Sequence, residues 1–391
     1  MKNFKLILKK NKEFSLLKGH PWAYSEAFRE LPGNLATGDR IEIYSHKDHF
    51  LGVGYADIDS KILVRLLPIG RDESFENGIA RLIKQAIAHR LDFFRDNDTN
   101  AFRLINGEGD GIPGLIADRY AGAVSLQIYS FGLEPFIKTI VNTIKESMAG
   151  IKWIWRRNQI RLAKTGSAEL VFGSNMPEKL EFREYGLKFV TDLVNGQKTG
   201  FFLDQRDNRN LIRSLAKGKS LLNVCGYTGA FTVAAIAGGA TSSVTVDIAK
   251  PALVEAEQIL KLNGFAGNAH KMVCSDMYDY LKICPQGSFD IVVLDPPSMA
   301  KSRKDSEKAI RAYKRLNQDG VKAVKPGGML FTASCTSQVG RGEFLDAVRE
   351  AIAAAGRRAA IIHESFHAPD HPVSLAHPEG QYLKGLLLKV Y

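Results

Sequence analysis

The stretch SLLNVCGYTGAF (residues 220–231) decides the fold of the second half of this 391-residue chain. It begins with a short apolar run, passes through a glycine-containing turn and continues into small residues typical of a helix. A short apolar run bounded by turn residues is consistent with a buried strand. The order strand, turn, helix opens a βαβ unit, so we ask whether the pattern repeats.

The pattern does repeat as far as the C-terminus. Further strands are predicted at SSVTVDIA (242–249), HKMVCSD (270–276), FDIVVLDPP (289–297), GGMLFTASC (327–335), AAIIHESF (359–366) and GLLLKVY (385–391). Helices are predicted between them at residues 229–240, 250–264, 277–285, 307–324 and 342–356. Strands that alternate with helices indicate a mostly parallel, doubly wound sheet, here of seven strands. Only a loop separates the last two strands, which predicts an antiparallel β-hairpin at the end of that sheet.

The first half of the chain has a different pattern. Short alternating runs separated by Gly, Asp and His occupy residues 1 to about 70, which is typical of a small β-barrel. A long amphipathic helix (76–94) and the turn-rich NGEGDGIPG (106–114) follow, and they indicate a separate α+β unit. We therefore predict three domains, at residues 1–72, 73–185 and 186–391.

Composition and charge limit the classes of protein. The N-terminus is basic without an apolar core, and no window approaches the roughly 18 apolar residues of a membrane helix, so a cytoplasmic protein is expected. The four cysteines form no CxxC pair, so neither a metal site nor a disulfide framework is predicted. The net charge of +11 permits an acidic partner such as nucleic acid. Nine bases and three acids lie between Lys301 and Lys325, beside the FDIVVLDPP strand, which favours phosphate binding there.

Polar residues follow the predicted strands where an open α/β sheet binds ligands, outside the carboxyl ends. Gly226 and Gly229 allow a tight turn before a helix N-terminus after the first strand. Asp247 at the end of the second strand is placed to accept hydrogen bonds from two ribose hydroxyls. Asp276, after the third, is placed to receive an adenine amino hydrogen. Either carboxylate could instead simply cap a helix, but the series of strand-end residues favours a nucleoside cofactor.

Two more strand ends carry candidate reactive groups. The fourth strand ends LDPPS, where two prolines fix a stiff turn beside Asp295. The fifth ends at Cys335, in LFTASCTSQV (330–339), where a merely buried cysteine is not expected because the run has become polar. The usual order of such sheets places these two strands side by side. Cys335 is therefore predicted to face the same ligand as Asp295 and, being a thiol, to act as a nucleophile.

At this point four motifs, NGQKTGFFLDQRDNR (195–209), LNVCGYTGAF (222–231), LDPPS (294–298) and ASCT (333–336), resemble a known family. This family is the bacterial 23S ribosomal RNA cytosine-5 methyltransferases, which are class I enzymes that use S-adenosylmethionine. LKGHPWAYSEAF (17–28) and LGVGYADIDSKILVRLL (51–67) look like its RNA-binding PUA domain, and NGEGDGIPGLIADRY (106–120) resembles its central domain. The resemblance covers essentially the whole chain. It implies a Rossmann-like methyltransferase domain after a PUA domain and an α+β domain.

The resemblance also implies roles for individual residues. The cofactor would be held by Lys198, Thr199, Phe201, Asp204, Arg206, Asn223, Cys225, Gly226, Tyr227, Thr228, Asp247, Asn263, Asp276, Asp295 and Pro296. Cys335 and Asp295 would flank the target base, and the PUA-like domain and the basic run would hold the RNA. The expected partner is large-subunit ribosomal RNA, and a homodimer is possible for a member of this family.

The implied chemistry is methyl transfer to carbon 5 of a cytosine through a covalent bond between Cys335 and carbon 6. One departure from related enzymes concerns Ser298, which follows Pro297 where many RNA cytosine-5 methyltransferases have a second cysteine that assists product release. Two alternatives stay open. One is methylation of a guanine, at N7 or at the exocyclic N2, without a covalent intermediate. The other is an RNA-binding protein that has lost catalysis.

Overall fold

The computed structural model describes residues 2–95, 98–158, 168–196, 199–265, 267–300 and 302–391. They divide into two compact units, each described here by itself. The first unit comprises Met1–Arg183, Val190–Leu203 and Pro369–Gly380. The second comprises Glu184–Phe189, Asp204–Ala368 and Gln381–Tyr391. The prediction of three separate domains stays a prediction, since the first two predicted segments fall within one unit.

The first unit begins with a small β-rich layer. Its elements are β1 (Asn3–Ile7), α1 (Phe14–Leu17), β2 (Trp22–Tyr24), β3 (Arg40–Tyr44), β4 (Phe50–Ala56) and β5 (Ile62–Leu67). The strands form one sheet in the order β1-β3-β4-β5-β2, with β1 parallel to β3 and the other pairs antiparallel. Leu6, Ile41, Ile43 and Val64 from these strands are buried together in one core. This core accounts for the alternating pattern predicted at the N-terminus.

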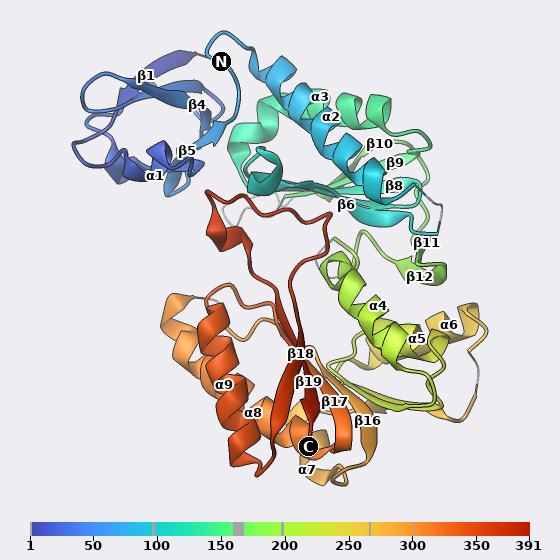
Figure 1. The fold of residues 1–391 in the computed structure, drawn as a ribbon. Coiled ribbons are helices and arrows are strands. Elements are labelled where there is room, and N and C mark those ends of the chain that lie inside the picture. Colours follow the sequence, from blue (N-terminus) through green and yellow to red (C-terminus); the bar gives the residue numbers. More distant parts are fainter. Residues whose placement is uncertain (1, 96–97, 159–167, 197–198, 266, 301) are drawn as a thin grey trace. The chain divides into compact units, whose positions relative to one another are not determined.

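A second sheet follows in the first unit. Its elements are α2 (Phe75–Phe93), β6 (Ala101–Asn106), β7 (Leu115–Tyr120), β8 (Ala123–Ile128), α3 (Ile137–Ser147), β9 (Trp153–Asn158) and β10 (Ala168–Phe172). The strand order is β10-β9-β8-β7-β6, and both helices cover the sheet (Figure 1). Ile79 and Ile83 of α2 and Ile140 of α3 pack into the same core as Val124 and Leu126 of β8. The strands β11 (Leu180–Glu184) and β12 (Leu187–Thr191) then form a two-stranded sheet, and the chain enters the main part of the second unit at Asp204.

The second unit contains the predicted α/β sheet. Its strands are β13 (Ser220–Val224), β14 (Ser242–Asp247), β15 (His270–Cys274), β16 (Phe289–Leu294), β17 (Val324–Ser334), β18 (Ala359–Ser365) and β19 (Lys384–Val390). Its helices are α4 (Arg206–Leu215), α5 (Ala230–Ala237), α6 (Lys250–Leu262), α7 (Met277–Ile283), α8 (Ser306–Lys322) and α9 (Arg341–Ala354). The described strands pair in the order β15-β14-β13-β16-β17-β19-β18. The predicted seven-stranded sheet is therefore confirmed.

Helices cover both faces of this sheet because side chains alternate along the strands (Figure 1). Leu222 and Val224 of β13 pack with Tyr313 of α8 and Phe344 of α9. Leu221, which points the other way, is buried in a separate core with residues of α4 and α5 such as Ile212 and Phe231. The apolar run Ser220–Val224 is thus a central strand buried on both faces.

The antiparallel end of the sheet is also confirmed, because β19 lies antiparallel to both β17 and β18. The connection between β18 and β19 was expected to be a plain loop. Its residues Pro369–Gly380 instead belong to the first unit. Asp370 there accepts a hydrogen bond from Arg103 N at 2.9 Å, and its carbonyl accepts one from the buried Arg90 guanidinium at 2.8 Å.

Candidate active site

The carboxyl ends of five parallel strands meet at one edge of the second unit's sheet. The registers of β15, β14, β13, β16 and β17 run parallel from one neighbour to the next. Cys225, Asp247, Asp276, Asp295 and Cys335 end these strands or follow them within two residues. The residues predicted from successive strand ends are therefore brought to one edge, where such sheets bind ligands.

The turn after β13 has an unusual backbone. Cys225 and Tyr227 have positive φ angles of 59° and 47°, which is uncommon for residues other than glycine. Gly226 between them leaves no room for a side chain, because an added Cβ would lie 2.4 Å from Thr245 Cγ2. Such strained conformations persist where the surrounding structure enforces them, often at ligand sites. The turn thus brings its backbone close to the strand edge.

Asp247 holds this turn in place. Its Oδ2 accepts a hydrogen bond from Tyr227 N at 2.8 Å, and its Oδ1 accepts one from Ala249 N at 2.8 Å. A carboxylate oxygen has more than one acceptor direction, so each oxygen can accept a further bond. The ribose role proposed for Asp247 and its structural role are compatible.

Asp276 is the N-cap of α7. Its Oδ1 accepts hydrogen bonds from Tyr278 N at 2.8 Å and Asp279 N at 3.4 Å. The capping alternative left open by the sequence is therefore observed. Since both bonds use one carboxylate oxygen, the capping role does not exclude contact with a ligand.

The edge is electrically negative around Cys225. Burial raises the pKa of the Cys225 thiol to about 12, so this cysteine stays protonated. The carboxylates of Asp295, Asp247 and Asp276 act on the thiol in the same direction. Three carboxylates close to one buried group favour a ligand that carries positive charge.

Asp295 is oriented by a chain of buried amides. Gln205 Nε2 donates to Asp295 Oδ1 at 2.8 Å, and Asn208 Nδ2 donates to Gln205 Oε1 at 2.5 Å. Gln205 and Asn208 are both almost completely buried. Because each amide is fixed by its neighbour, the Asp295 carboxyl group is held in one orientation at the C-terminal end of β16.

Cys335 lies beside the Asp295 turn. Its Sγ is 3.9 Å from the carbonyl oxygen of Pro296. Thr336 ties the two turns together, since its Oγ1 accepts from Met299 N at 3.0 Å and bonds to Tyr313 Oη at 2.7 Å. Cys335 is half-buried. The predicted neighbours Asp295 and Cys335 thus come from adjacent strands and adjacent turns.

Two buried oxygen atoms at this edge suit a bound nucleoside. Asn223 Oδ1 and Thr228 Oγ1 are two of the buried side-chain atoms that have no hydrogen-bond partner within the described residues. Both residues belong to β13 or to the turn that follows it. Buried polar atoms are normally paired, so these two are candidates to bond a ligand in the turn. Together with the three carboxylates, they fit a cofactor with polar groups and a positive charge.

Other predicted cofactor residues have hydrogen-bond partners within their own unit or are not described by the structure. Thr199 and Phe201 belong to the first unit, where Thr199 Oγ1 donates to Asp118 Oδ2 at 2.5 Å and Phe201 N donates to Tyr120 Oη at 3.1 Å. Lys198 is outside the described residues. The cofactor roles of these three residues stay predictions.

The remaining three belong to the second unit. Asp204 Oδ2 accepts from Tyr382 Oη at 2.7 Å, and the buried Arg206 pairs with Asp207 at 3.3 Å. Asn263 ends α6, and its side chain bonds both the N–H and the carbonyl of Lys188, at 2.9 and 2.7 Å. These contacts are structural, and a cofactor role for these residues stays a prediction as well.

Sequence reasoning missed three residues of this site: Gln205, Thr336 and Lys384. Gln205 and Thr336 stand inside motifs that were quoted, yet nothing in their spacing marks them. Lys384 carries a detectable signal, because it is a base at the start of the apolar run LLL in the last strand.

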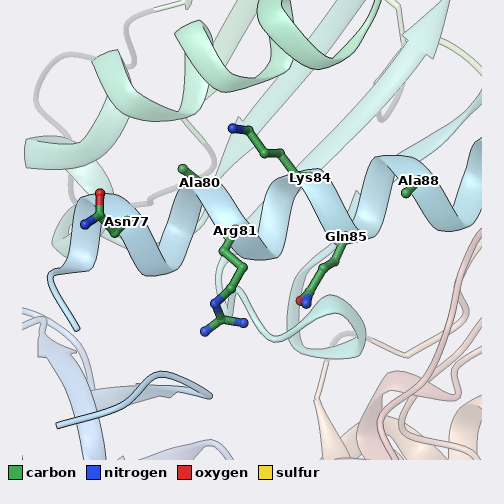
Figure 2. Close-up of a pocket in the computed structure, with 6 residues that line it drawn as sticks. All are labelled: Asn77, Ala80, Arg81, Lys84, Gln85 and Ala88. Carbon is green, nitrogen blue, oxygen red and sulfur yellow. The ribbon is translucent and has the colours of Figure 1, made fainter. Parts of the chain in front are cut away.

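Two other features of the first unit do not form a reactive site. A shallow groove of about 460 Å³ runs along α2, lined by Asn77, Ala80, Arg81, Lys84, Gln85 and Ala88 (Figure 2). The lining side chains are those of a solvated helix face.

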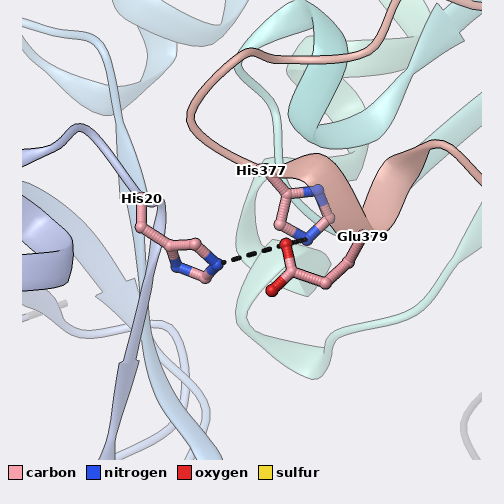
Figure 3. A group of neighbouring side chains, drawn as sticks. All are labelled: His20, His377 and Glu379. Atoms are coloured by element: carbon pink, nitrogen blue, oxygen red, sulfur yellow. Dashed lines mark ion pairs between the residues drawn. The ribbon is translucent and has the colours of Figure 1, made fainter. Parts of the chain in front are cut away.

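The second feature is the cluster of His20, His377 and Glu379 (Figure 3). His20 Nδ1 accepts a hydrogen bond from Trp22 N at 3.2 Å, so the neutral ring carries its proton on Nε2. That nitrogen faces Glu379 Oε2 at 3.6 Å. We therefore interpret the cluster as imidazole–carboxylate contacts that hold residues 369–380, since a metal ion would need the same nitrogen without its proton.

No helix in the ranges that the structure describes combines the length and the apolar character needed to cross a membrane.

Comparison with known proteins shows the family to which this chain belongs. Residues 147–370 match a family described as S-adenosylmethionine-dependent methyltransferase, and residues 6–68 match a PUA-like domain. A "Ribosomal RNA large subunit methyltransferase I" of Alteromonas mediterranea is 36% identical over 391 residues, 98% of each chain. A "Ribosomal RNA large subunit methyltransferase" of Deinococcus radiodurans is 35% identical over 399 residues, 99% of this chain and 97% of the relative.

Solved structures share the fold over the whole chain. A SAM-dependent methyltransferase from Streptococcus mutans aligns with a TM-score of 0.84 at 25% identity, covering 99% of this chain and 100% of the other. A methyltransferase solved in complex with SAH aligns with a TM-score of 0.86 at 24% identity over 100% of both chains. With its strand-end carboxylates and a matching family model over more than half of its length, the chain belongs to the S-adenosylmethionine-dependent methyltransferases.

Proposed function

We propose that this protein transfers a methyl group from S-adenosylmethionine to carbon 5 of a cytosine in large-subunit ribosomal RNA. The observation that carries the proposal is the half-buried Cys335, whose Sγ lies 3.9 Å from the Pro296 carbonyl in the turn that also bears Asp295. The printed names of the relatives support ribosomal RNA of the large subunit as the substrate. The PUA-like match supports an RNA partner.

The chemistry explains why a cysteine is needed. Carbon 5 of cytosine is a poor nucleophile, and the bound cofactor supplies an electrophilic methyl group. The Cys335 thiolate would add to carbon 6, which gives carbon 5 the electron density to take the methyl group. The methyl–sulfur bond of the sulfonium would break at the same time, with its electron pair left on a neutral thioether sulfur. A base then removes the proton from carbon 5, the carbon–sulfur bond breaks, and the thiolate leaves with its electron pair.

Asp295 is placed to assist this addition. Negative charge develops at N3 of the cytosine as carbon 6 is attacked. A protonated or hydrogen-bonded Asp295 carboxyl would stabilise that charge. Gln205 and Asn208, which fix the rotamer of Asp295, would then act as positioning residues. The target base must leave its stack to reach this edge.

The reaction can be tested in cells. Bisulfite sequencing of large-subunit ribosomal RNA compares a strain lacking the gene with the same strain complemented by the wild-type protein or by Cys335→Ala. We expect one cytosine to resist conversion only with the wild-type protein. Loss of a methylguanosine instead, seen by nucleoside mass spectrometry, would refute cytosine as the target and favour the guanine alternative.

Asp247 is expected to contribute to cofactor binding. Replacing Asp247 by Ala removes the proposed acceptor of the ribose hydroxyls and the hydrogen bond to Tyr227 N. The free energy of S-adenosylmethionine binding should therefore become less favourable by roughly 1–3 kcal/mol. Calorimetric titration with S-adenosylmethionine measures this change, with the exposed Asp279→Ala as the control. If the Asp247→Ala protein binds S-adenosylmethionine with unchanged affinity, Asp247 does not bind the ribose.

The N-terminal end of α8 is expected to bind RNA phosphates. Several bases of the predicted run pair with acids: Arg311 with Glu307, Lys314 with Glu350, Lys322 with Asp319 and Lys325 with Asp290. Arg303, Lys304 and Lys308 are exposed and have no ion pair within the described ranges, whereas Lys301 is outside them. Three unpaired cations on one exposed segment are therefore available to phosphates.

Replacing Arg303, Lys304 and Lys308 together by Gln is expected to raise KM for RNA with a smaller effect on kcat. The slope of log affinity against log salt should fall by roughly 0.7 to 0.9 for each phosphate that the protein no longer neutralises. Filter binding at several salt concentrations measures this slope. Lys314→Gln and Lys322→Gln are matched controls, and an equal loss of affinity in those variants would contradict a local phosphate site.

A further inference from the structure

We propose that Lys384 is a positioning residue for Cys335: its ammonium group holds the turn that carries the cysteine and supplies the positive charge that favours the thiolate. The inference rests on the proposed function, in which Cys335 is the nucleophile. Lys384 was not among the residues predicted from sequence, although a base at the start of an apolar run could have drawn attention to it.

The sheet itself brings Lys384 to this place. β19 lies antiparallel to β17, and Lys384, its first residue, is opposite Ser334. Ser334 is the residue directly before Cys335. The lysine side chain is only 5% exposed, so the ammonium group lies inside the protein next to the turn.

The ammonium group bonds both ends of the Cys335 turn. Lys384 Nζ donates to the carbonyl oxygen of Thr336 at 2.8 Å and to that of Val339 at 2.7 Å. These residues lie one and four positions after Cys335. A single cation therefore closes residues 336–339 into a fixed turn, and Thr336 in turn bonds Met299 in the Asp295 turn.

A buried cation is costly unless charge compensates it. Burial lowers the pKa of Lys384 to about 8, and interaction with Cys335 and with Glu343 of α9 opposes that lowering. The interaction is mutual, so a charged Lys384 stabilises a charged Cys335. Glu343 is itself engaged, since its carboxylate accepts from Gly340 N at 2.6 Å.

Two other ionisable groups near the thiol, Tyr313 and Asp295, do not supply this charge. Tyr313 of α8 has a pKa raised to about 12, chiefly by burial, so it stays neutral and bonds Thr336 Oγ1. Asp295 carries negative charge when ionised and would oppose a thiolate. Lys384 is thus the cation that acts on Cys335 from β19, whereas Cys225 at the same edge is surrounded by carboxylates and has its pKa raised.

The test is the pH dependence of cysteine alkylation in the full-length protein without cofactor. Iodoacetamide reacts with thiolates, and peptide mass spectrometry follows Cys335, Cys225, Cys274 and Cys284 separately in one sample. We expect Cys335 to be alkylated at lower pH than Cys225 in the wild type. In Lys384→Met the pH at which Cys335 alkylation reaches half of its maximal rate should rise by about one unit or more. In Lys384→Arg this midpoint pH should stay near the wild-type value.

Lys389→Met is the matched control, because Lys389 lies on the same strand and its ammonium group bonds the carbonyl of Gly327, at the other end of β17 from Cys335. An unchanged Cys335 midpoint in a folded Lys384→Met protein would overturn the inference. If the Lys384→Met protein does not fold, the wild-type protein still tests the inference. A Cys335 midpoint pH as high as that of Cys225 in the wild type would overturn it. The proposed function fails by a different result, namely that the Cys335→Ala protein still methylates RNA. This result does not depend on the alkylation profile.

Discussion

Replacing Cys335 by Ala is expected to abolish methylation of large-subunit ribosomal RNA while leaving affinity for S-adenosylmethionine nearly unchanged. Without the sulfur atom, carbon 6 of the base is not attacked and carbon 5 stays unreactive. Loss of a covalent nucleophile is among the largest effects that one substitution has on an enzyme, so a fall of at least about 10⁴-fold in kcat is expected. Transfer of labelled methyl groups to an RNA transcript measures it.

The cofactor affinity of the same variant shows whether the site survives. The strand-end carboxylates Asp247 and Asp276 are held by backbone contacts in which Cys335 takes no part. Cys274→Ala, which removes an exposed thiol at the end of β15, is the matched control and should methylate normally. A Cys335→Ala protein that methylates at the wild-type rate would show that Cys335 is not the nucleophile.

Replacing Asp295 by Ala is expected to lower kcat by roughly 10² to 10⁴-fold, the usual contribution of a positioned acid or hydrogen-bond donor. The carboxyl group is proposed to stabilise the charge that develops at N3 of the cytosine. Single-turnover measurements with saturating RNA separate this effect from RNA binding. Asp279→Ala, an exposed carboxylate on α7, should have no comparable effect.

The amide chain behind Asp295 allows a finer test. Gln205→Ala leaves the Asp295 carboxyl in place but removes the donor 2.8 Å from its Oδ1. A smaller fall in kcat than in Asp295→Ala is expected, together with a shift of the pH–rate profile. If Asp295→Ala retains the wild-type kcat, Asp295 serves the cofactor or the fold and takes no part in the methyl transfer step.

The sequence predicted the α/β half of the chain closely because its signals are local. Apolar runs such as FDIVVL end at turn residues, and parallel strands bring their carboxyl ends together. Asp295 and Cys335, which are 40 residues apart, could therefore be placed on neighbouring strands from the sequence alone. The same reasoning gave helix capping as the alternative role of Asp276, and the structure shows Asp276 as the N-cap of α7.

Other parts of the structure depend on contacts between residues that are distant in the sequence. The periodicity of apolar residues does not reveal such contacts. The residues between β18 and β19 carry no motif, yet Pro369–Gly380 belong to the first unit, where Asp370 bonds Arg103. Lys384 and Gln205 are likewise defined by their partners. A lysine at the start of an apolar strand looks like a strand boundary until its two carbonyl acceptors are known.

The covalent route makes one measurement decisive: trapping the enzyme on RNA that contains 5-fluorocytosine. After methyl transfer to such a base, carbon 5 carries no proton to remove, so the bond between Cys335 and carbon 6 cannot break. We predict a complex that survives denaturation, requires S-adenosylmethionine, shows the base on the Cys335 peptide by mass spectrometry and is absent from Cys335→Ala. Efficient methylation of ordinary RNA by an enzyme that forms no such complex, and by Cys335→Ala, would contradict the account.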